Sequence, residues 1–341
     1  MWNNSSCLYP RTFSTIGLPI IYSIMFVLSV FGNLVCLWIF TKFTSKKTST
    51  HIYLINLTIS NILVSAGMPF QAAYYLKVQY MPYSSTECRF LTQFGNLLTH
   101  SSMCVSIILL CWIAISRYAI LVKHDEMTQS VKQTPYEKIL FGKFLKSFRN
   151  PKFARYLCIG IWIAVACPNV YLVTVTTDHA SNKLCFNEEV EIGKSHVVIS
   201  SRVELAFFFL FALTVILFYC FFINYIKTLQ ANSCIDGKFL IYRKVKRNIV
   251  AIMALLLICF APYHLSKLFI YGLVTVKDCQ LLNISLEIKN ICLCLAEFRS
   301  CCDPIMYFCL DDNFKRNFQT LFKKKPDGSS TQLQATNITP V

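Results

Sequence analysis

Long apolar stretches follow one another along this chain, and short polar segments separate them. A run of about 18 or more apolar residues is long enough to cross a bilayer as a helix. Backbone groups find no water inside the hydrocarbon layer, so each span must satisfy its own hydrogen bonds as a helix. The pattern therefore predicts membrane-spanning helices at about residues 18–41, 52–77, 90–122, 155–177, 203–227, 248–274 and 284–309.

These spans predict an all-α fold, a seven-transmembrane helix bundle with a short amphipathic eighth helix. We expect an N-terminal segment over 1–17, the bundle over 18–309, and a cytoplasmic helix and tail over 310–341. The polar start lacks the basic residues and hydrophobic core of a cleavable signal peptide, so the first span should act as its own insertion signal. A basic amphipathic helix is predicted over 312–325, followed by a polar segment typical of disorder.

Composition and charge support a membrane protein. Hydrophobic residues make up 55% of the chain and charged residues only 15%, whereas soluble domains carry about 25% charged residues. The net charge of +16 raises the question of a nucleic-acid ligand. However, most Lys and Arg residues follow the first, third and fifth spans or lie in the tail, which is the positive-inside bias. We therefore expect a plasma-membrane protein with its N-terminus outside, a basic face toward anionic lipid and no nucleic-acid partner.

Most of the 17 cysteines lie within the spans, where a cysteine is usually a small inert apolar residue. Four lie at the external ends, in oxidising space: Cys7, Cys88, Cys185 and Cys279. An even number in that compartment predicts two disulfides, and the sequence allows three pairings. The chain shows neither the paired aspartates of an intramembrane protease nor a metal-ligand cluster, so we expect no enzyme activity, no metal and no cofactor.

The segment after the third span contains a further amphipathic pattern. Over 136–149 apolar residues, including Leu145 and Phe148, recur at helical spacing between lysines and arginines, and Pro151 follows. This pattern predicts a basic helix lying on the inner leaflet. Docking of a G protein or a kinase is the alternative.

Short motifs occupy fixed places in the spans: Gly32-Asn33, Ser116-Arg117-Tyr118, Trp162, Phe260-Ala261-Pro262-Tyr263 and Asp303-Pro304-Ile305-Met306-Tyr307. In this order the set resembles the rhodopsin-like (class A) G-protein-coupled receptors, whose DRY, CWxP and NPxxY motifs occur here in variant form. The likeness covers about residues 18–322. It implies a receptor that signals to a heterotrimeric G protein, with arrestin as a further partner.

Within that class, Phe260, Asp303 and the four external cysteines resemble the purinergic-like branch, which includes the nucleotide receptors and several orphans. The segments HIYLINLTISN and CWIAISRYAI resemble an orphan receptor of that branch. The resemblance implies that Cys88 pairs with Cys185 and Cys7 with Cys279. It also leaves one spacing unexplained, because Cys88 lies about one helical turn further from Arg117 than in the family. Either the third helix begins with an extra turn, or the chain bulges near 94–95.

The resemblance assigns Arg117 and Tyr118 to the G-protein cavity. The family usually has an acidic residue before this arginine, and Ser116 cannot form that ion pair. We therefore expect that the inactive state is less well stabilised and that basal signalling is raised. A merely snorkelling arginine is the alternative.

Two prolines are expected to kink the sixth and seventh helices, because proline lacks an N–H group and clashes with the preceding turn. These are Pro262, beside which Phe260 replaces the usual tryptophan, and Pro304. The resemblance implies that Tyr307 moves toward Arg117 on activation, with Tyr219 as its partner. A passive kink with an aromatic core residue is the alternative for the sixth helix.

Arg299 and Asp303 are four residues apart in the seventh span, so they share one helix face. Family members hold a sodium ion in this region. Here Asn61 replaces the carboxylate of the second helix, Ser106 is kept on the third, and Arg299 adds a positive charge. We predict an internal Arg299–Asp303 pair near Asn61 and no sodium site. Otherwise Arg299 points toward Glu297 or lipid.

The external half of the sixth span carries Tyr263, His264 and Lys267, and Lys289 lies one turn inside the seventh. His264 and Lys267 are three apart, so we expect them to point the same way. Nucleotide receptors bind phosphate with such a pattern, and clustered positive charge in a partly dry pocket favours an anion. This predicts a nucleotide, a phospholipid or an acidic metabolite as ligand. Snorkelling lysines, or Glu287 neutralising Lys289, are the alternatives.

Three external asparagines begin glycosylation sequons: Asn3, Asn4 and Asn283. Two further function classes stay open. A non-signalling scavenger or accessory membrane protein fits the altered motifs, and a channel or transporter would need ionisable residues along a path. The sequence does not name the ligand, the G-protein subtype, the tissue or the oligomeric state.

Overall fold

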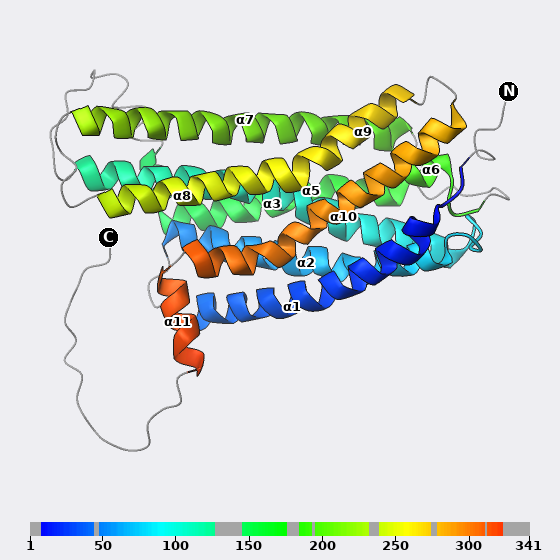
Figure 1. Ribbon diagram of the computed structural model, residues 1–341, viewed down its shortest axis with the longest axis horizontal. Coiled ribbons are helices and arrows are strands. Elements are labelled where there is room, and N and C mark those ends of the chain that lie inside the picture. The colour runs from blue at the N-terminus through cyan, green and yellow to red at the C-terminus, as the bar shows by residue number, and fades with distance from the viewer. Residues whose placement is uncertain are drawn as a thin grey trace, which may run out of the picture.

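The computed structural model describes residues 8–43, 48–126, 145–175, 184–192, 195–231, 239–273, 278–310 and 312–322. Its long helices run side by side along one axis (Figure 1). In chain order they are α1 (Leu18–Lys42), α2 (Ser49–Lys77), α3 (Thr86–Glu126), α5 (Pro151–Val175), α7 (Ser195–Ala231), α8 (Phe239–Leu255), α9 (Ala261–Leu273) and α10 (Cys279–Leu310). The π-helical turn η2 (Phe13–Gly17) precedes α1, and η3 (Leu256–Phe260) joins α8 to α9 as one span. The short helices are α6 (Glu188–Glu191) and α11 (Asp312–Phe322).

In the described part of the chain, six spans are long and apolar enough to cross a membrane. The seventh, α10, has the length but carries five charged residues: Glu287, Lys289, Glu297, Arg299 and Asp303. Large apolar side chains on α7 face outward, including Phe207, Leu210 and Leu217. Outward-facing apolar side chains of this kind are favourable in contact with lipid hydrocarbon and unfavourable in contact with water. The described chain therefore forms an all-α membrane bundle, and the predicted fold class is confirmed.

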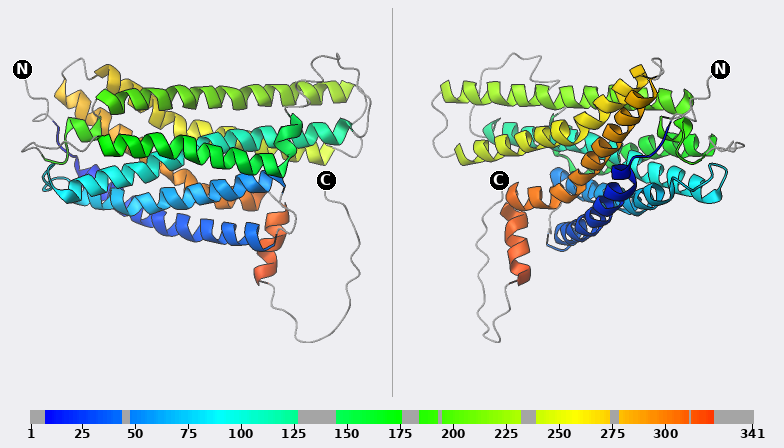
Figure 2. Two further views of the ribbon diagram at one scale, coloured as in Figure 1. Left: turned by 180° about the vertical axis from the view of Figure 1, so that it is seen from behind. Right: turned by 45° about the vertical axis from the view of Figure 1, so that its right-hand side comes forward.

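The bundle has two distinct ends, which Figures 1 and 2 show from different sides. At one end α6 lies beside the start of α1, and we call this the α6 end. At the other end α11 lies across the direction of the long helices, and we call this the α11 end. The Phe314 ring of α11 is buried, with its centroid 5.3 Å from that of Phe40 on α1. The predicted amphipathic eighth helix is therefore present and docked by an aromatic contact.

Glycines allow α2 and α3 to approach closely. A Cβ atom at Gly67 would lie 2.8 Å from Thr99 Oγ1, and one at Gly95 would lie 3.3 Å from Phe70 Cβ. Small residues at such contacts let transmembrane backbones come together. The third helix is also unbroken from Thr86 onward. Of the two explanations for the position of Cys88, the extra helical turn is therefore right and the bulge is wrong.

The sixth span changes its helical geometry immediately before the predicted kink. The π-helical turn η3 ends at Phe260, and Pro262 follows in the first turn of α9. A single π turn is a frequent feature of functional sites, and proline removes one backbone donor from the ladder. The helix is thus already irregular where Phe260 lies.

The segment before α5 differs from its prediction. Leu145 and Phe148 are buried, and the Phe148 ring lies 5.0 Å from that of Trp112 on α3. Arg149 Nη1 donates to the Ala119 carbonyl at 3.4 Å. This end of the predicted lipid-facing helix therefore packs on the protein, because two large apolar side chains find a site against α3. Residues 127–144 lie outside the described part of the chain.

Candidate functional site

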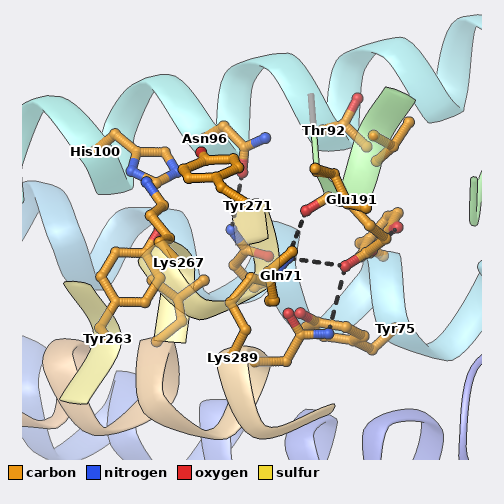
Figure 3. A pocket seen from close by; sticks show the side chains of 16 residues that line it. Gln71, Tyr75, Thr92, Asn96, His100, Glu191, Tyr263, Lys267, Tyr271 and Lys289 are labelled. Carbon is orange, nitrogen blue, oxygen red and sulfur yellow. Dashed lines mark hydrogen bonds and ion pairs between the residues drawn. The ribbon is translucent and has the colours of Figure 1, made fainter. Parts of the chain in front are cut away.

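A cavity of about 100 Å³ lies toward the α6 end of the bundle. Residues from α2, α3, α6, α9 and α10 line it (Figure 3). Its polar lining includes Gln71, Asn96, His100, Glu191, Lys267 and Lys289. Small-molecule sites usually enclose about 300–1,000 Å³. A ligand larger than a few waters would therefore need some of these side chains to move.

Both predicted lysines line the cavity, and each is paired with a carboxylate. Lys267 Nζ lies 3.2 Å from Glu204 Oε2 of α7 and 4.8 Å from the centre of the Tyr263 ring. Lys289 Nζ lies 3.1 Å from Glu191 Oε2 and donates to the Glu191 carbonyl at 2.7 Å. The positive charge that the sequence places here is therefore balanced from within the protein.

One residue of the predicted site, and one alternative to that site, are not borne out by the structure. The imidazole of His264 stacks on Phe208 of α7, with ring centroids 4.4 Å apart, and His264 is not among the residues that line the cavity. The aromatic surface of α7 holds this ring away from the face that Lys267 presents. Glu287 does not neutralise Lys289 either, because its Oε2 accepts from Arg11 Nη1 at 3.1 Å.

Sequence reasoning missed His100 and the two acidic partners. His100 lines the cavity from α3, with its ring centroid 6.3 Å from that of Tyr263. Glu204 and Glu191 lie outside every motif, and Glu191 belongs to the segment after the fourth span, whose path no periodicity predicts. The signal available was the excess of acidic residues in 188–191, shortly after a predicted disulfide cysteine.

A disulfide and a helix cap hold this external segment on the bundle. Cys88 and Cys185 are bonded, with their Cα atoms 6.0 Å apart, so the pairing that the resemblance implies is formed. Asn187 Oδ1 accepts from the Val190 N–H at 3.1 Å and so caps α6. Cys279 is also disulfide-bonded. Its expected partner, Cys7, lies outside the described residues.

A second polar site lies deeper, where α2, α3 and α10 meet. Arg299 forms an ion pair with Asp303 Oδ2, and both side chains are buried. The other guanidinium nitrogen, Nη2, donates to Asn61 Oδ1 at 2.6 Å and to Ser106 Oγ at 2.8 Å. The Arg299 Cζ atom also lies 5.4 Å from the centre of the Phe260 ring. We call these five residues the charge cluster.

The geometry of the charge cluster settles where Arg299 points. Its side chain turns inward along α10 to Asp303, not toward Glu297 or lipid. Asn61 Nδ2 donates to the same carboxylate at 2.8 Å and to Asn33 Oδ1 of α1 at 3.0 Å. Four helices thus share one hydrogen-bond network around a fixed positive charge, which would repel a cation.

At the α11 end, Ser116 bonds to α2. Its buried Oγ lies 2.9 Å from Thr50 Oγ1 and 3.3 Å from Ser49 Oγ. The next residue, Arg117, is half-buried. Tyr118 is buried, with its ring centroid 5.9 Å from that of Phe218 on α7. The serine hydroxyl therefore joins α3 to α2 at the position where the resemblance implies an acidic residue.

Tyr307 packs toward α1 and α11. Its buried ring lies 5.4 Å from that of Phe40 and 6.1 Å from that of Phe314. Pro304, one turn earlier, meets α1 closely, because a Cβ atom at Gly32 would lie 2.9 Å from its Cγ. Tyr219 is half-buried on α7. Its pairing with Tyr307 stays a prediction.

The predicted glycan at Asn283 does not fit this fold. Asn283 is only 3% exposed, and its Nδ2, the atom that would carry the glycan, donates to the Cys279 carbonyl at 2.8 Å. Its Oδ1 accepts from the Tyr9 N–H at 3.0 Å. Asn3 and Asn4 lie outside the described residues. Among the residues that the structure describes, no group of three or more His, Cys, Asp or Glu could hold a metal ion.

Comparison with known proteins places this geometry in context. The sequence model described as "7 transmembrane receptor (rhodopsin family)" matches residues 32–307. "Probable G-protein coupled receptor 82" of Homo sapiens is 40% identical over 328 residues, covering 95% of this chain and 97% of the relative. The protein of that name from Mus musculus is 39% identical over 95% of this chain and 100% of its own length. A purinoceptor of Rattus norvegicus is 25% identical over 97% of this chain and 86% of its own.

Proposed function

The chain belongs to the rhodopsin family of seven-transmembrane receptors, and we propose that it carries a signal from an extracellular, anionic small ligand to heterotrimeric G proteins. Its relatives are receptors and not enzymes, and the protein crosses the membrane several times. The ligand class, the orientation of the N-terminus and the coupling to G proteins belong to the proposal.

One observation carries the proposal: the cavity and the charge cluster are built on the same spans, namely α2, α3, α10 and the span that η3 and α9 form together. Lys267 and Tyr263 of the cavity lie on α9, just beyond Pro262 and the π-helical turn η3. At the end of that turn Phe260 lies against the guanidinium of Arg299 on α10. A ligand that changes the partner of Lys267 would act on a helix that is already irregular. Movement of this helix would alter the Phe260–Arg299 contact. This supports transmission of a conformational change from the cavity to the α11 end.

The lining of the cavity supports an anionic ligand. Two lysines and one histidine converge on a small cavity between the helices, and opposite charges attract more strongly in such surroundings than in open water. Each lysine already has a carboxylate partner, so an incoming acid would exchange one ion pair for another. A nucleotide, a phospholipid and an acidic metabolite all fit this chemistry. The rat relative is named as a purinoceptor, which adds weight to nucleotides.

The orientation follows from charge and redox chemistry. The Cys88–Cys185 disulfide lies at the α6 end, and disulfides persist in oxidising space. Lys315 and Arg316 lie at the α11 end, as the positive-inside bias favours for the cytoplasmic side. We therefore place the α6 end outside the plasma membrane and the α11 end inside, where a G protein and arrestin bind.

A cell-based coupling assay tests the proposal. Activation of a panel of G proteins is measured for the wild type and for Arg117→Ala at matched surface expression, without ligand and then with nucleotides and acidic metabolites. We expect a basal signal that Arg117→Ala abolishes, and responses to acids that Lys289→Ala weakens. Uptake of ligand without G-protein activation in any arm would instead identify a scavenger and overturn the proposal.

A further inference from the structure

We propose that Glu191 is a resident anion of the cavity: its carboxylate occupies the subsite that binds the carboxylate of an external organic acid, and the ligand must displace it. The proposal deepens the proposed function, on which it rests for the consequence of displacement. The subsite itself is defined by contacts that do not depend on signalling. Figure 3 shows Glu191 at one side of the cavity, joined to Lys289, with Lys267 and His100 at the other side.

The two oxygens of the Glu191 carboxylate each have a donor. The Tyr74 hydroxyl of α2 donates to Oε1 at 2.5 Å. Lys289 Nζ donates to Oε2 at 3.1 Å, and Asn290 Nδ2 lies 3.5 Å from the same atom. The glutamate is only 8% exposed. Hydrogen bonds to an ionised acceptor are stronger than neutral ones, so two transmembrane helices form a built carboxylate site.

Glu191 reaches this site from a short external segment and not from one of the long helices. It is the last residue of α6, a single helical turn of four residues. The segment is tied to α3 by the disulfide of Cys185 and to itself by the Asn187 cap. A single turn makes fewer contacts than a spanning helix, so its local opening costs less than unfolding such a helix. The Cys88–Cys185 disulfide can stay in place while the Glu191 side chain leaves the subsite.

The Lys289 ammonium decides which ligands can displace Glu191. Its side chain is only 13% exposed, and it contacts both the carboxylate and the backbone carbonyl of Glu191. Removing one member of a buried ion pair leaves the other charge uncompensated, which is strongly unfavourable. A neutral ligand would impose that cost, whereas an acid would take over the pair. The cavity therefore selects a ligand that brings its own negative charge.

The shape of the subsite favours a carboxylate. The Tyr74 hydroxyl donates to one carboxylate oxygen, and the Lys289 ammonium and the Asn290 amide lie against the other. This arrangement suits a ligand group with two acceptor oxygens. The small cavity then limits the rest of the molecule to a compact chain. Gln71, Asn96, His100 and Lys267 line the remaining wall and offer further donors. The structure thus points to a compact organic acid with polar or acidic groups beyond its carboxylate.

Accessibility of an engineered cysteine tests the inference without a G-protein readout. Asn96→Cys is placed in the cavity of the full chain on intact cells, and the unmodified chain supplies the background of native cysteines. The probe is the anionic, membrane-impermeant reagent sulfonatoethyl methanethiosulfonate. We expect Glu191→Gln to raise the reaction rate of the introduced thiol roughly tenfold, within the usual range for coupled sites. Glu189→Gln, on the same helix but hydrogen-bonded to Tyr83 outside the cavity lining, is the matched control and should leave the rate unchanged.

A rescue experiment identifies the chemical class. In Glu191→Gly, propionate has the carbon chain of the missing side chain, and we expect millimolar propionate to restore the slow wild-type rate. Propionamide, which has the same shape but no charge, should not. Equal rates in the wild type and Glu191→Gln would overturn the proposal, as would equal protection by propionamide. Protection by inorganic phosphate but not by propionate would assign the subsite to phosphate and also overturn it. Surface labelling of each variant shows that it folds and reaches the membrane.

The two proposals fail separately. A receptor that activates no G protein still gives the accessibility result if Glu191 closes the cavity. If the receptor signals normally but the introduced thiol reacts at the same rate in all variants, only the role of Glu191 is refuted.

Discussion

Arg299 and Asp303 form an ion pair inside the bundle, one helical turn apart on α10. The same guanidinium bonds to Asn61 on α2 and to Ser106 on α3, and it lies over the ring of Phe260. A single side chain therefore links three spanning helices to Phe260 on a fourth span. The guanidinium takes the carboxylate that a bound cation would need.

Neutralising one member of this pair should destabilise the receptor more than neutralising both. Arg299→Met alone leaves Asp303 buried without its cation, and Asp303→Asn alone leaves the guanidinium without its anion. Either change should cost about 3–5 kcal/mol, whereas the double variant should recover much of the loss. Thermal melting of the detergent-solubilised receptor, followed by size-exclusion fluorescence, measures this. Additive losses in the double variant would show that the pair is not coupled.

Sodium should have no specific effect on the wild-type protein. The Asp303 carboxylate and the Asn61 amide are engaged by Arg299, whose charge opposes a second cation. We expect the same melting temperature in sodium chloride and in choline chloride at equal ionic strength. Arg299→Ala, which frees the carboxylate, serves as the comparison and should gain a sodium-dependent increase. A sodium-specific increase in the wild type would contradict the assignment of this site to Arg299.

Ser116→Asp should lower basal signalling. Ser116 now bonds to hydroxyls of α2, and an aspartate there could also pair with the neighbouring Arg117. A half-exposed ion pair contributes up to about 1 kcal/mol, so we expect a reduction of about two- to fivefold. Basal G-protein activation at matched surface expression measures it. Ser116→Thr keeps the hydroxyl and should behave like the wild type, whereas unchanged signalling in Ser116→Asp would exclude a role for the missing ion pair in basal signalling.

Gly67 should tolerate no larger side chain while Thr99 faces it. A Cβ atom at Gly67 would lie 2.8 Å from Thr99 Oγ1. Gly67→Val should therefore destabilise the α2–α3 contact by about 1–3 kcal/mol, the usual cost of overpacking. The added change Thr99→Ala should recover part of the loss. Gly160→Val is the control, since a Cβ atom there meets nothing within 4 Å. Equal melting temperatures for the two glycine variants would show that the helices do not approach so closely.

Features that depend on helical spacing could be predicted from the sequence. The apolar runs predict the spans, because hydrocarbon permits few other structures. The four-residue spacing of Arg299 and Asp303 predicts their contact, since helical geometry fixes that neighbourhood. The two lysines of the cavity lie on different helices, α9 and α10, and the resemblance to nucleotide receptors predicts them instead.

Features that depend on how helices and loops meet could not be predicted in this way. His264 shares a helix face with Lys267, yet the aromatic surface of Phe208 on another helix decides where its ring lies. Asn283 matches a glycosylation sequon, but the fold buries it against Tyr9. Glu191 and Glu204 reach the two lysines from segments distant in the sequence, so the neutralisation of both lysines becomes visible only in three dimensions.

The bundle itself should transmit a signal to a G protein. Nucleotide exchange on purified heterotrimeric G proteins, with the receptor alone in lipid nanodiscs, tests this most directly. We predict that wild-type receptor accelerates exchange on at least one heterotrimer without added ligand, because Ser116 cannot form the ion pair that would stabilise the inactive state, and that Arg117→Ala does not. Exchange at the rate of empty nanodiscs for every heterotrimer tested would contradict it.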